Sequence, residues 1–187
     1  MSIEASPKRY EEYAYVLDST VRGRSSVIRG REGPIVQAIG EDRFTLLEFL
    51  ALNNAKFEIG ERISIGQEGR TKIKSVLGRL SYDDLSNDSK EDLMSVVESM
   101  ILLNESRYII YYNELQPLTP RLHALELIPG IGKTIMKQIV EERTKNLFST
   151  FEDLQNRVKI RDPIKLLAKG IIKEISGATR IYLFMRR

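Results

Sequence analysis

The segment Leu127-Ile128-Pro129-Gly130-Ile131-Gly132-Lys133 lies between two stretches with helical patterns and decides how the C-terminal part of the chain folds. A bend of about five residues between two helices requires positive φ, which glycine adopts without a side-chain clash. Gly130 and Gly132 supply that freedom, and Pro129 discourages the first helix from continuing. Ile131 can then turn inward and hold the bend against both helices. We therefore predict a helical hairpin.

The same bend leaves backbone amides without covering side chains. Amides at the start of a helix, together with the helix dipole, attract anions. Lys133 and Lys137 add positive charge one turn apart. A nucleotide-binding P-loop requires glycine where Leu127 stands, which disfavours an ATP or GTP site of that kind. The residues expected to contact nucleic-acid phosphate here are Pro129, Gly130, Ile131, Gly132, Lys133, Thr134 and Lys137.

This segment resembles the helix-hairpin-helix motif of many DNA- and RNA-processing proteins. In that family the hairpin amides hold backbone phosphate without reading the base sequence, so the resemblance implies sequence-tolerant binding. A glycine turn that binds nothing is the alternative. The sequence also leaves open whether carbonyl groups of the hairpin hold a monovalent cation.

The residues after the hairpin indicate a second copy of the same unit. Thr150–Asp153 is a capping pattern that opens a short helix, and Asp162-Pro163 opens another that Gly177 closes. Residues 117–177 therefore resemble an all-α tandem helix-hairpin-helix domain. The second turn, Val158–Arg161, contains no glycine. We expect the side chains of Lys159 and Arg161 to replace amide contacts there.

Charge is segregated along the chain although its net value is only +3. Residues 80–117 carry 2 basic against 8 acidic residues, whereas residues 118–187 carry 14 basic against 7 acidic residues. A basic region that contains the hairpin is the electrostatic footprint of a nucleic-acid binder. The chain has no cysteine, which excludes disulfides and thiolate metal sites. No long apolar run or signal-peptide pattern occurs, so we expect a cytoplasmic protein with no membrane partner.

The first part of the chain has the pattern of strands separated by turns. Alternating or short apolar runs at 10–18, 35–39, 63–65 and 73–77, with a further strand favoured at 44–51, predict a small antiparallel barrel. Glu58–Gly66 resembles a segment of OB-type barrels, which bind oligonucleotides. Four arginines near the start of this region are expected to contact phosphates and bases, although a solvated hairpin explains them equally well: Arg22, Arg24, Arg29 and Arg31.

The predicted fold class is α+β. Residues 1–116 are expected to form the OB-like barrel with an acidic helix at 89–104, capped by Ser89, and a strand at 108–112. Pro117 and Pro120 mark the boundary to the tandem domain. Residues 178–187 are expected to return as a strand and pair with the barrel. Over its whole length the chain resembles an uncharacterised archaeal family proposed to bind nucleotides or RNA.

The expected function is non-catalytic binding of RNA or DNA, without a metal or another cofactor. His123 is the only histidine, and a helix-start role is favoured for it over a phosphate contact. Adjacent carboxylates have helix-start explanations, so a glycosylase or nuclease is disfavoured. A protein-interaction scaffold in a repair, replication or translation assembly is the alternative, with protein partners docking on the hairpins. The sequence does not distinguish RNA from DNA, or a single strand from a duplex.

Overall fold

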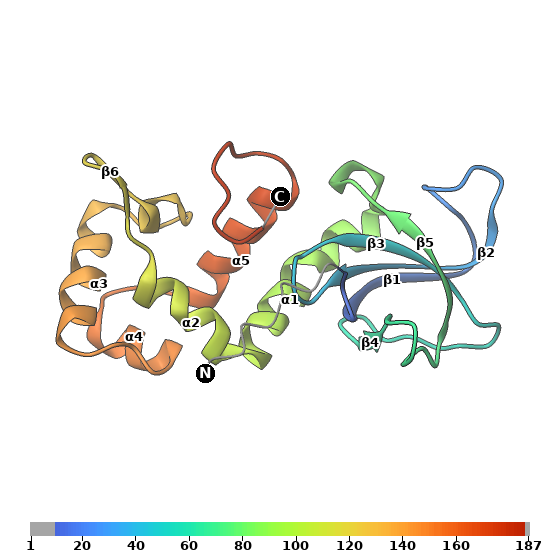
Figure 1. Cartoon of the computed structure of the whole chain (residues 1–187), viewed down its shortest axis with the longest axis horizontal. Coiled ribbons are helices and arrows are strands. Elements are labelled where there is room, and N and C mark those ends of the chain that lie inside the picture. The colour runs from blue at the N-terminus through green and yellow to red at the C-terminus, as the bar shows by residue number, and fades with distance from the viewer. Residues whose placement is uncertain (1–9, 186–187) are drawn as a thin grey trace, which may run out of the picture. The chain divides into compact units, whose positions relative to one another are not determined.

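The structure is a computed structural model that describes residues 10–185, and its architecture is α+β (Figure 1). The chain divides into two compact units, Met1–Val96 and Val97–Arg187. This division lies inside α1 (Asn87–Leu103), upstream of the boundary predicted from the two prolines. No helix within residues 10–185 is long and apolar enough to cross a bilayer.

The first unit is a curled five-stranded antiparallel sheet. Its strands are β1 (Tyr13–Arg24), β2 (Glu32–Gly40), β3 (Leu46–Ala51), β4 (Arg62–Ser64) and β5 (Ile73–Arg79). The order across the sheet is β4-β1-β2-β3-β5. All five predicted strands are confirmed, including the ambiguous one at 44–51. Because the edge strands β4 and β5 do not pair within the described residues, the sheet is a half-barrel rather than a closed barrel.

The two faces of this sheet bury different residues. On one face, apolar side chains such as Val16, Val36 and Phe49 form a continuous core. On the other face, the Gln37 side chain accepts hydrogen bonds from the Ser86 amide and the Ser89 hydroxyl. These two bonds attach the start of α1 to the sheet. Register is strongly specified, because a one-residue slip would exchange the two faces.

Helix α1 begins two residues earlier than the predicted acidic helix. The Ser86 hydroxyl accepts the amide of Ser89 at 3.0 Å, so Ser86 occupies the capping position that we assigned to Ser89. The Ser89 side chain is buried and donates to Gln37 instead. The local sequence offers two serines that could cap the helix. The hydrogen bond from Ser89 to Gln37, which is distant in sequence, leaves Ser86 as the capping residue.

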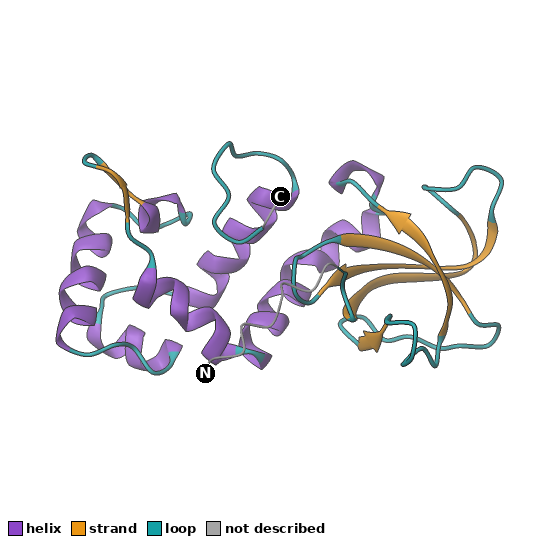
Figure 2. Ribbon diagram, in the orientation of Figure 1, coloured by secondary structure: helices purple, strands orange, loops and turns teal. Residues whose placement is uncertain are grey.

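The second unit consists mainly of helices (Figure 2). After α1 its elements are α2 (Glu105–Glu114), β6 (Pro117–Thr119), β7 (Leu122–His123), the 3-10 helix η2 (Ala124–Leu127), α3 (Lys133–Lys145), α4 (Phe151–Arg157) and α5 (Pro163–Ile175). Another 3-10 helix, η1 (Tyr82–Asp84), precedes α1. The cap predicted for α4 is in place, because the Thr150 hydroxyl accepts the Asp153 amide at 3.0 Å. Pro163 is the first residue of α5 as predicted, but Asp162 at the N-cap position makes no side-chain capping hydrogen bond.

The predicted strand at 108–112 is wrong, because these residues form the middle of α2. Tyr108, Ile109 and Tyr112 are buried at helical spacing, and the Tyr112 hydroxyl donates to the Pro163 carbonyl at 2.8 Å. Aromatic and β-branched residues favour strands only weakly. Here burial against α5 overrides that preference.

The predicted C-terminal strand is also wrong. Residues 180–185 form no strand, and their backbone amides bond to a side chain instead of to the half-barrel. The buried Glu174 carboxylate accepts the amides of Phe184 at 3.1 Å and Met185 at 2.9 Å. The Phe184 ring packs on Tyr111 with centroids 4.8 Å apart. Burial raises the pKa of Glu174, against the lowering effect of these amides. Arg186 and Arg187 lie outside the described residues.

The helix predicted before the bend is largely replaced by other structure. Residues 117–123 form the β6–β7 hairpin, and only the four residues of η2 are helical. Pro120 lies between the two short strands and lacks an amide hydrogen, which disfavours a regular helix there. The element directly before the glycine bend is therefore a short 3-10 helix and not an α-helix.

Candidate functional site

The bend between η2 and α3 uses its two glycines differently. Gly130 has φ +91, a region that favours glycine, whereas Gly132 has φ −89 and is the N-cap of α3. The prediction that both require positive φ is therefore wrong for Gly132. Ile131 turns inward as predicted and is only 4% exposed. Its amide donates to the Ile128 carbonyl at 3.1 Å, which closes the bend.

The start of α3 presents uncovered backbone amides. The first bond of the helix runs from the Met136 amide to the Gly132 carbonyl, and within residues 10–185 no acceptor bonds the amides of residues 132–135. A Cβ at Gly132 would have nothing within 4 Å, so the space beside this residue is open. The first turn of α3 contains no acidic residue. Together these features make the start of α3 electropositive.

The basic side chains of the second unit fall into two groups. Lys133 and Lys137 are exposed at the start of α3 and form no ion pair with any described residue, and Thr134 is exposed beside them. In contrast, the Arg143 guanidinium donates to the carbonyls at the end of α2, at 2.7 Å for Leu115. Lys145 pairs with Glu142 at 2.6 Å. Within α3, the positive charge that is free to meet a ligand therefore lies at the end next to the bend.

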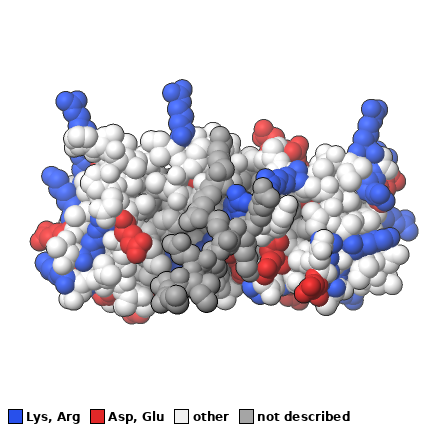
Figure 3. Space-filling model, in the orientation of Figure 1, with Lys and Arg blue, Asp and Glu red and all other residues white. Residues whose placement is uncertain are grey.

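Figure 3 shows basic side chains projecting over the region of α3, with acidic side chains among them. This face is therefore not uniformly basic. Arg157 has a structural role, because its guanidinium stacks 4.5 Å from the Phe148 ring and pairs with Asp153 at 3.2 Å. An anion that approaches the second unit meets unpaired charge at particular places, not over the whole surface.

The second turn, which lacks glycine, has alternating exposure. Val158 and Ile160 are buried, whereas Lys159 and Arg161 are exposed between α4 and α5. Asp162 takes the left-handed conformation that glycine would otherwise supply, with φ 48. Both predicted basic residues of this turn therefore face solvent, and their contact with phosphate stays a prediction.

The four predicted arginines lie in the first unit, two at the end of β1 and two in the loop between β1 and β2, which we call the arginine loop. Arg22, Arg24, Arg29 and Arg31 are all exposed. Arg24 pairs with Glu32 at 2.9 Å on the surface. The structure thus does not bring these arginines into the unit that contains the glycine bend.

A buried carboxylate holds this loop on the sheet. Glu48, on β3, is fully buried and accepts the Ser26 amide at 3.0 Å and the Ser25 hydroxyl. The Val27 side chain lies over β5, because a Cβ at Gly78 would be 2.6 Å from Val27 Cγ1. Arg29 and Arg31 therefore project from a loop that is held on the sheet, which lowers the entropy lost when a ligand binds.

A family model described as "Protein of unknown function (DUF655)" matches residues 10–186. The chain belongs to the DUF655 family. It is 37% identical over 182 residues to the uncharacterized protein MJ0038 of Methanocaldococcus jannaschii, covering 96% of this chain and 82% of that protein. The match to an archaeal protein family, expected from the order of elements, is confirmed at this level.

Similarity in structure agrees with the family match. The crystal structure of Af1531 from Archaeoglobus fulgidus superposes with a TM-score of 0.86 at 39% identity, covering 94% of this chain and 100% of that one. A shorter similarity of 41% over 59 residues relates 30% of this chain to 4% of a PolC-type DNA polymerase III from Ureaplasma parvum. The half-barrel and helical units are thus shared with the Af1531 structure.

Lysines on α5 were missed by the sequence analysis. The bend packs on this helix: a Cβ at Gly130 would lie 2.9 Å from Leu166 Cδ2, and one at Gly170 would lie 3.5 Å from Pro129 Cδ. Helical periodicity places Lys169 and Lys173 on the flank of the face that carries Leu166, and both are exposed. The spacing of Lys165, Lys169 and Lys173 by four residues is a sequence signal that could have revealed this row.

His123 has the helix-start role favoured from the sequence. Its Nδ1 accepts the Leu125 amide at 3.1 Å, and its own amide donates to Glu126 at 3.0 Å. Burial and the nearby Arg143 charge lower the pKa of His123. The imidazole is therefore held neutral at the start of η2. No group of three metal-ligating side chains occurs in the part of the chain that the structure describes.

Proposed function

We propose that the chain is a non-catalytic, sequence-tolerant nucleic-acid-binding protein whose glycine bend holds backbone phosphates. The observation that carries this proposal is the uncovered start of α3, where four amides lack acceptors within the described residues and nothing lies within 4 Å of a Cβ at Gly132. A phosphate oxygen would accept from these amides and complete the capping of the helix. Lys133 and Lys137 would add long-range attraction.

The bend would act as a helix-hairpin-helix element with a shortened first helix. In this interpretation η2 takes the place of the first helix, and its four residues are enough to fix Ile128 and Ile131 in the core. The turn at Lys159 and Arg161 would be the second, side-chain-based contact of a tandem domain. Lys169 and Lys173, beside the bend on α5, would extend the phosphate path.

The half-barrel would supply a second contact surface. Its strand order, β4-β1-β2-β3-β5, is compatible with an OB-type barrel that is open between β4 and β5. Arg29 and Arg31 belong to the β1–β2 loop, which contacts oligonucleotides in such barrels, and Arg22 and Arg24 lie next to it at the end of β1. A similarity over 59 residues to part of a DNA polymerase also favours a nucleic-acid partner.

Salt-dependent binding tests this proposal. Fluorescence anisotropy of labelled 20-nucleotide single-stranded RNA, single-stranded DNA and duplex DNA should show binding whose logarithmic affinity falls linearly with the logarithm of the salt concentration. Replacing Lys133 and Lys137 with alanine should weaken binding to unrelated sequences about equally. The salt slope should fall by roughly 1 to 2, because each phosphate contact contributes about 0.7 to 0.9.

Lys145→Ala is the matched control, because Lys145 is exposed at the opposite end of α3 and is already paired with Glu142. The nucleic-acid affinity and the salt slope of the Lys145→Ala variant should match those of the unmodified protein. If no nucleic acid binds even at low salt, the proposal is wrong, and a protein-interaction scaffold becomes the better explanation of the bend.

A further inference from the structure

The open side of the half-barrel contains a cleft of about 980 Å³. It is lined by the start of β1, the β2–β3 turn, the end of β4 with the following loop, and β5. The cleft therefore occupies the gap where β4 and β5 would meet in a closed barrel. Its volume lies at the upper end of the range for small-molecule sites, roughly 300–1,000 Å³. All of its lining residues belong to the first unit.

The walls of the cleft provide an apolar surface and an exposed aromatic ring. Leu47 on β3, Val76 on β5 and Ile65 after β4 line it from both sides of the gap. Tyr10 also lines it and is 74% exposed, although tyrosine rings usually bury most of their surface. An uncovered ring beside aliphatic side chains is suited to stacking on a planar aromatic group.

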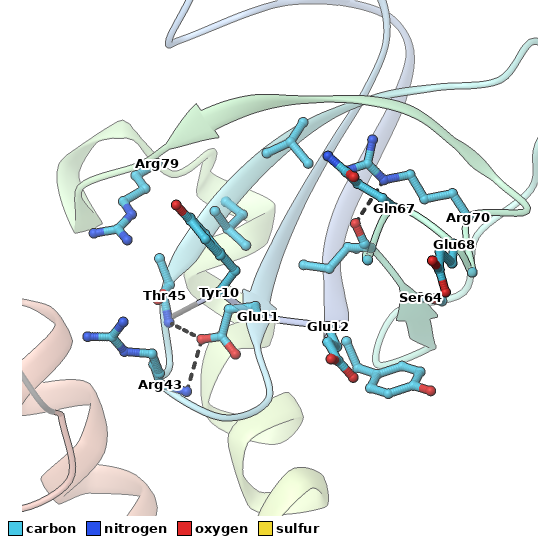
Figure 4. A pocket seen from close by; sticks show the side chains of 16 residues that line it. Tyr10, Glu11, Glu12, Arg43, Thr45, Ser64, Gln67, Glu68, Arg70 and Arg79 are labelled. Carbon is cyan, nitrogen blue, oxygen red and sulfur yellow. Dashed lines mark hydrogen bonds between the residues drawn. The ribbon is translucent and has the colours of Figure 1, made fainter. Parts of the chain in front are cut away.

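Arginines stand at both ends of this surface (Figure 4). Arg43 and Arg79 lie at one end with Thr45 and Tyr10, and Arg70 lies at the other end near Gln67. Arg79 is opposite Leu47 in the β3–β5 register and forms no ion pair with any described residue. The Arg70 Nε donates to the Ile65 carbonyl at 2.8 Å, which orients its guanidinium.

The acidic residue nearest to Arg43 and Arg79 is already bound. Glu11 accepts the amide of Asp42 at 2.8 Å and that of Arg43 at 2.9 Å, so its carboxylate is part of the β2–β3 turn. A Cβ at Gly40 would overlap Glu11, at 2.2 Å, which shows how closely this side chain is packed. The Glu11 carboxylate is therefore held in the turn and not free to move onto Arg79, while Glu12 and Glu68 are the other acidic residues that line the cleft.

We infer that this cleft is a nucleotide-binding site, in which the phosphate meets Arg79 and the base lies between Tyr10 and the apolar wall. The chemistry recognised is an aromatic base covalently linked to a phosphate. A free mononucleotide and the terminal nucleotide of a single strand share that chemistry. The inference goes beyond the proposed function, because it depends on no residue of the glycine bend.

Calorimetric titration of the full chain with adenosine and uridine 5′-monophosphate tests the inference. Adenosine without phosphate, and inorganic phosphate alone, are the reference probes. We expect the mononucleotides to bind with a dissociation constant below about 1 mM and both reference probes to bind at least about tenfold more weakly. Arg79→Ala and Tyr10→Ala should each weaken mononucleotide binding about tenfold, as expected for a charge-assisted or stacking contact.

Lys56→Ala is the matched control, because Lys56 is also an exposed basic residue of the first unit but does not line the cleft and has no part in the proposed nucleic-acid contacts. Its affinity for mononucleotides should not change. Circular dichroism should show that all three variants fold, since each replaces an exposed side chain. The inference is overturned if mononucleotides do not bind or bind no more tightly than phosphate. It is also overturned if neither Arg79→Ala nor Tyr10→Ala lowers the affinity for mononucleotides.

The source of the nucleotide is distinguished in a Gly132→Asp background, which removes the proposed contact at α3. Tighter binding of a 5′-phosphorylated penta-adenylate than of the mononucleotide, competed by the mononucleotide, identifies a strand end as the ligand. Binding of the mononucleotide alone identifies a free nucleotide. Either result supports a nucleotide site in the cleft, even if the glycine bend binds no nucleic acid. One proposal can therefore be wrong while the other holds.

Discussion

A Cβ atom at Gly130 would lie 2.9 Å from Cδ2 of Leu166. Two residues later, a Cβ at Gly132 would have no neighbour within 4 Å. One glycine of the bend is thus required for packing against α5, and the other leaves space where a ligand can approach. A substitution at each position therefore tests a different property, folding at Gly130 and binding at Gly132.

Replacing Gly130 with alanine should destabilise the second unit. The substitution adds strain at φ +91 and forces Leu166 to move, which together should lower the free energy of unfolding by about 2–4 kcal/mol. Urea denaturation monitored by circular dichroism measures the change. Gly177→Ala is the control, because Gly177 also has positive φ but would have no Cβ neighbour within 4 Å. Equal losses in the two variants would show that contact with Leu166 is unimportant.

Replacing Gly132 with aspartate should change stability and binding in opposite directions. Gly132 is the N-cap of α3 and has no side-chain cap, so an aspartate there should raise the free energy of unfolding by about 0.5 kcal/mol. The same carboxylate would occupy the free amides and repel phosphate, weakening nucleic-acid binding about tenfold. Urea denaturation and anisotropy titrations measure the two effects.

Gly132→Asn separates capping from charge. Asparagine caps a helix about as well as aspartate but adds no negative charge. It should stabilise α3 to a similar extent and weaken binding less than Gly132→Asp does. If the aspartate variant binds nucleic acid as tightly as the unmodified protein, the amides at the start of α3 are not the phosphate site.

Removing the Glu48 carboxylate should release the arginine loop. Glu48→Ala leaves the amide of Ser26 and the hydroxyl of Ser25 without their acceptor and creates a small buried cavity. We expect a loss of about 2–4 kcal/mol in the free energy of unfolding. Amides of residues 26–28 should also exchange with deuterium faster. The control is Glu32→Ala, which breaks only the exposed pair with Arg24 and should change stability by less than about 1 kcal/mol.

The sequence predicted best those features that depend on nearby residues. Turn signals between short apolar runs located all five strands of the half-barrel, because each strand's periodicity is visible within its own length. The cap at Thr150 and the proline at the start of α5 were located for the same reason. At the bend, the inward position of Ile131 followed from the two flanking glycines.

Features that depend on distant residues were predicted wrongly or missed. Residues 108–112 look like a strand until the burial of Tyr112 against α5 is known. The C-terminal segment looks like a strand because nothing nearby reveals that the Glu174 carboxylate takes its amides. The cleft was missed because its lining residues come from segments between Tyr10 and Arg79 that are far apart in sequence.

Acidic pH should destabilise the protein through His123. Burial lowers the pKa of His123 in the folded protein. As the pH falls, the imidazole therefore takes up a proton near pH 6.5 in the unfolded chain but only at a lower pH in the folded protein. The stabilisation from the neutral imidazole is therefore complete above pH 6.5. It is lost progressively as the pH falls from 6.5 to the lowered pKa of the folded state, since protonated Nδ1 no longer accepts the Leu125 amide.

The His123→Asn variant tests this pH dependence, because asparagine offers an oxygen acceptor that does not titrate. The free energy of unfolding of the variant should fall less between pH 7.5 and pH 5.5 than that of the unmodified protein. Urea denaturation at the two pH values measures the difference, and the imidazole resonances of this single histidine report its pKa by NMR. Parallel losses in the two proteins would show that another group controls the acid sensitivity.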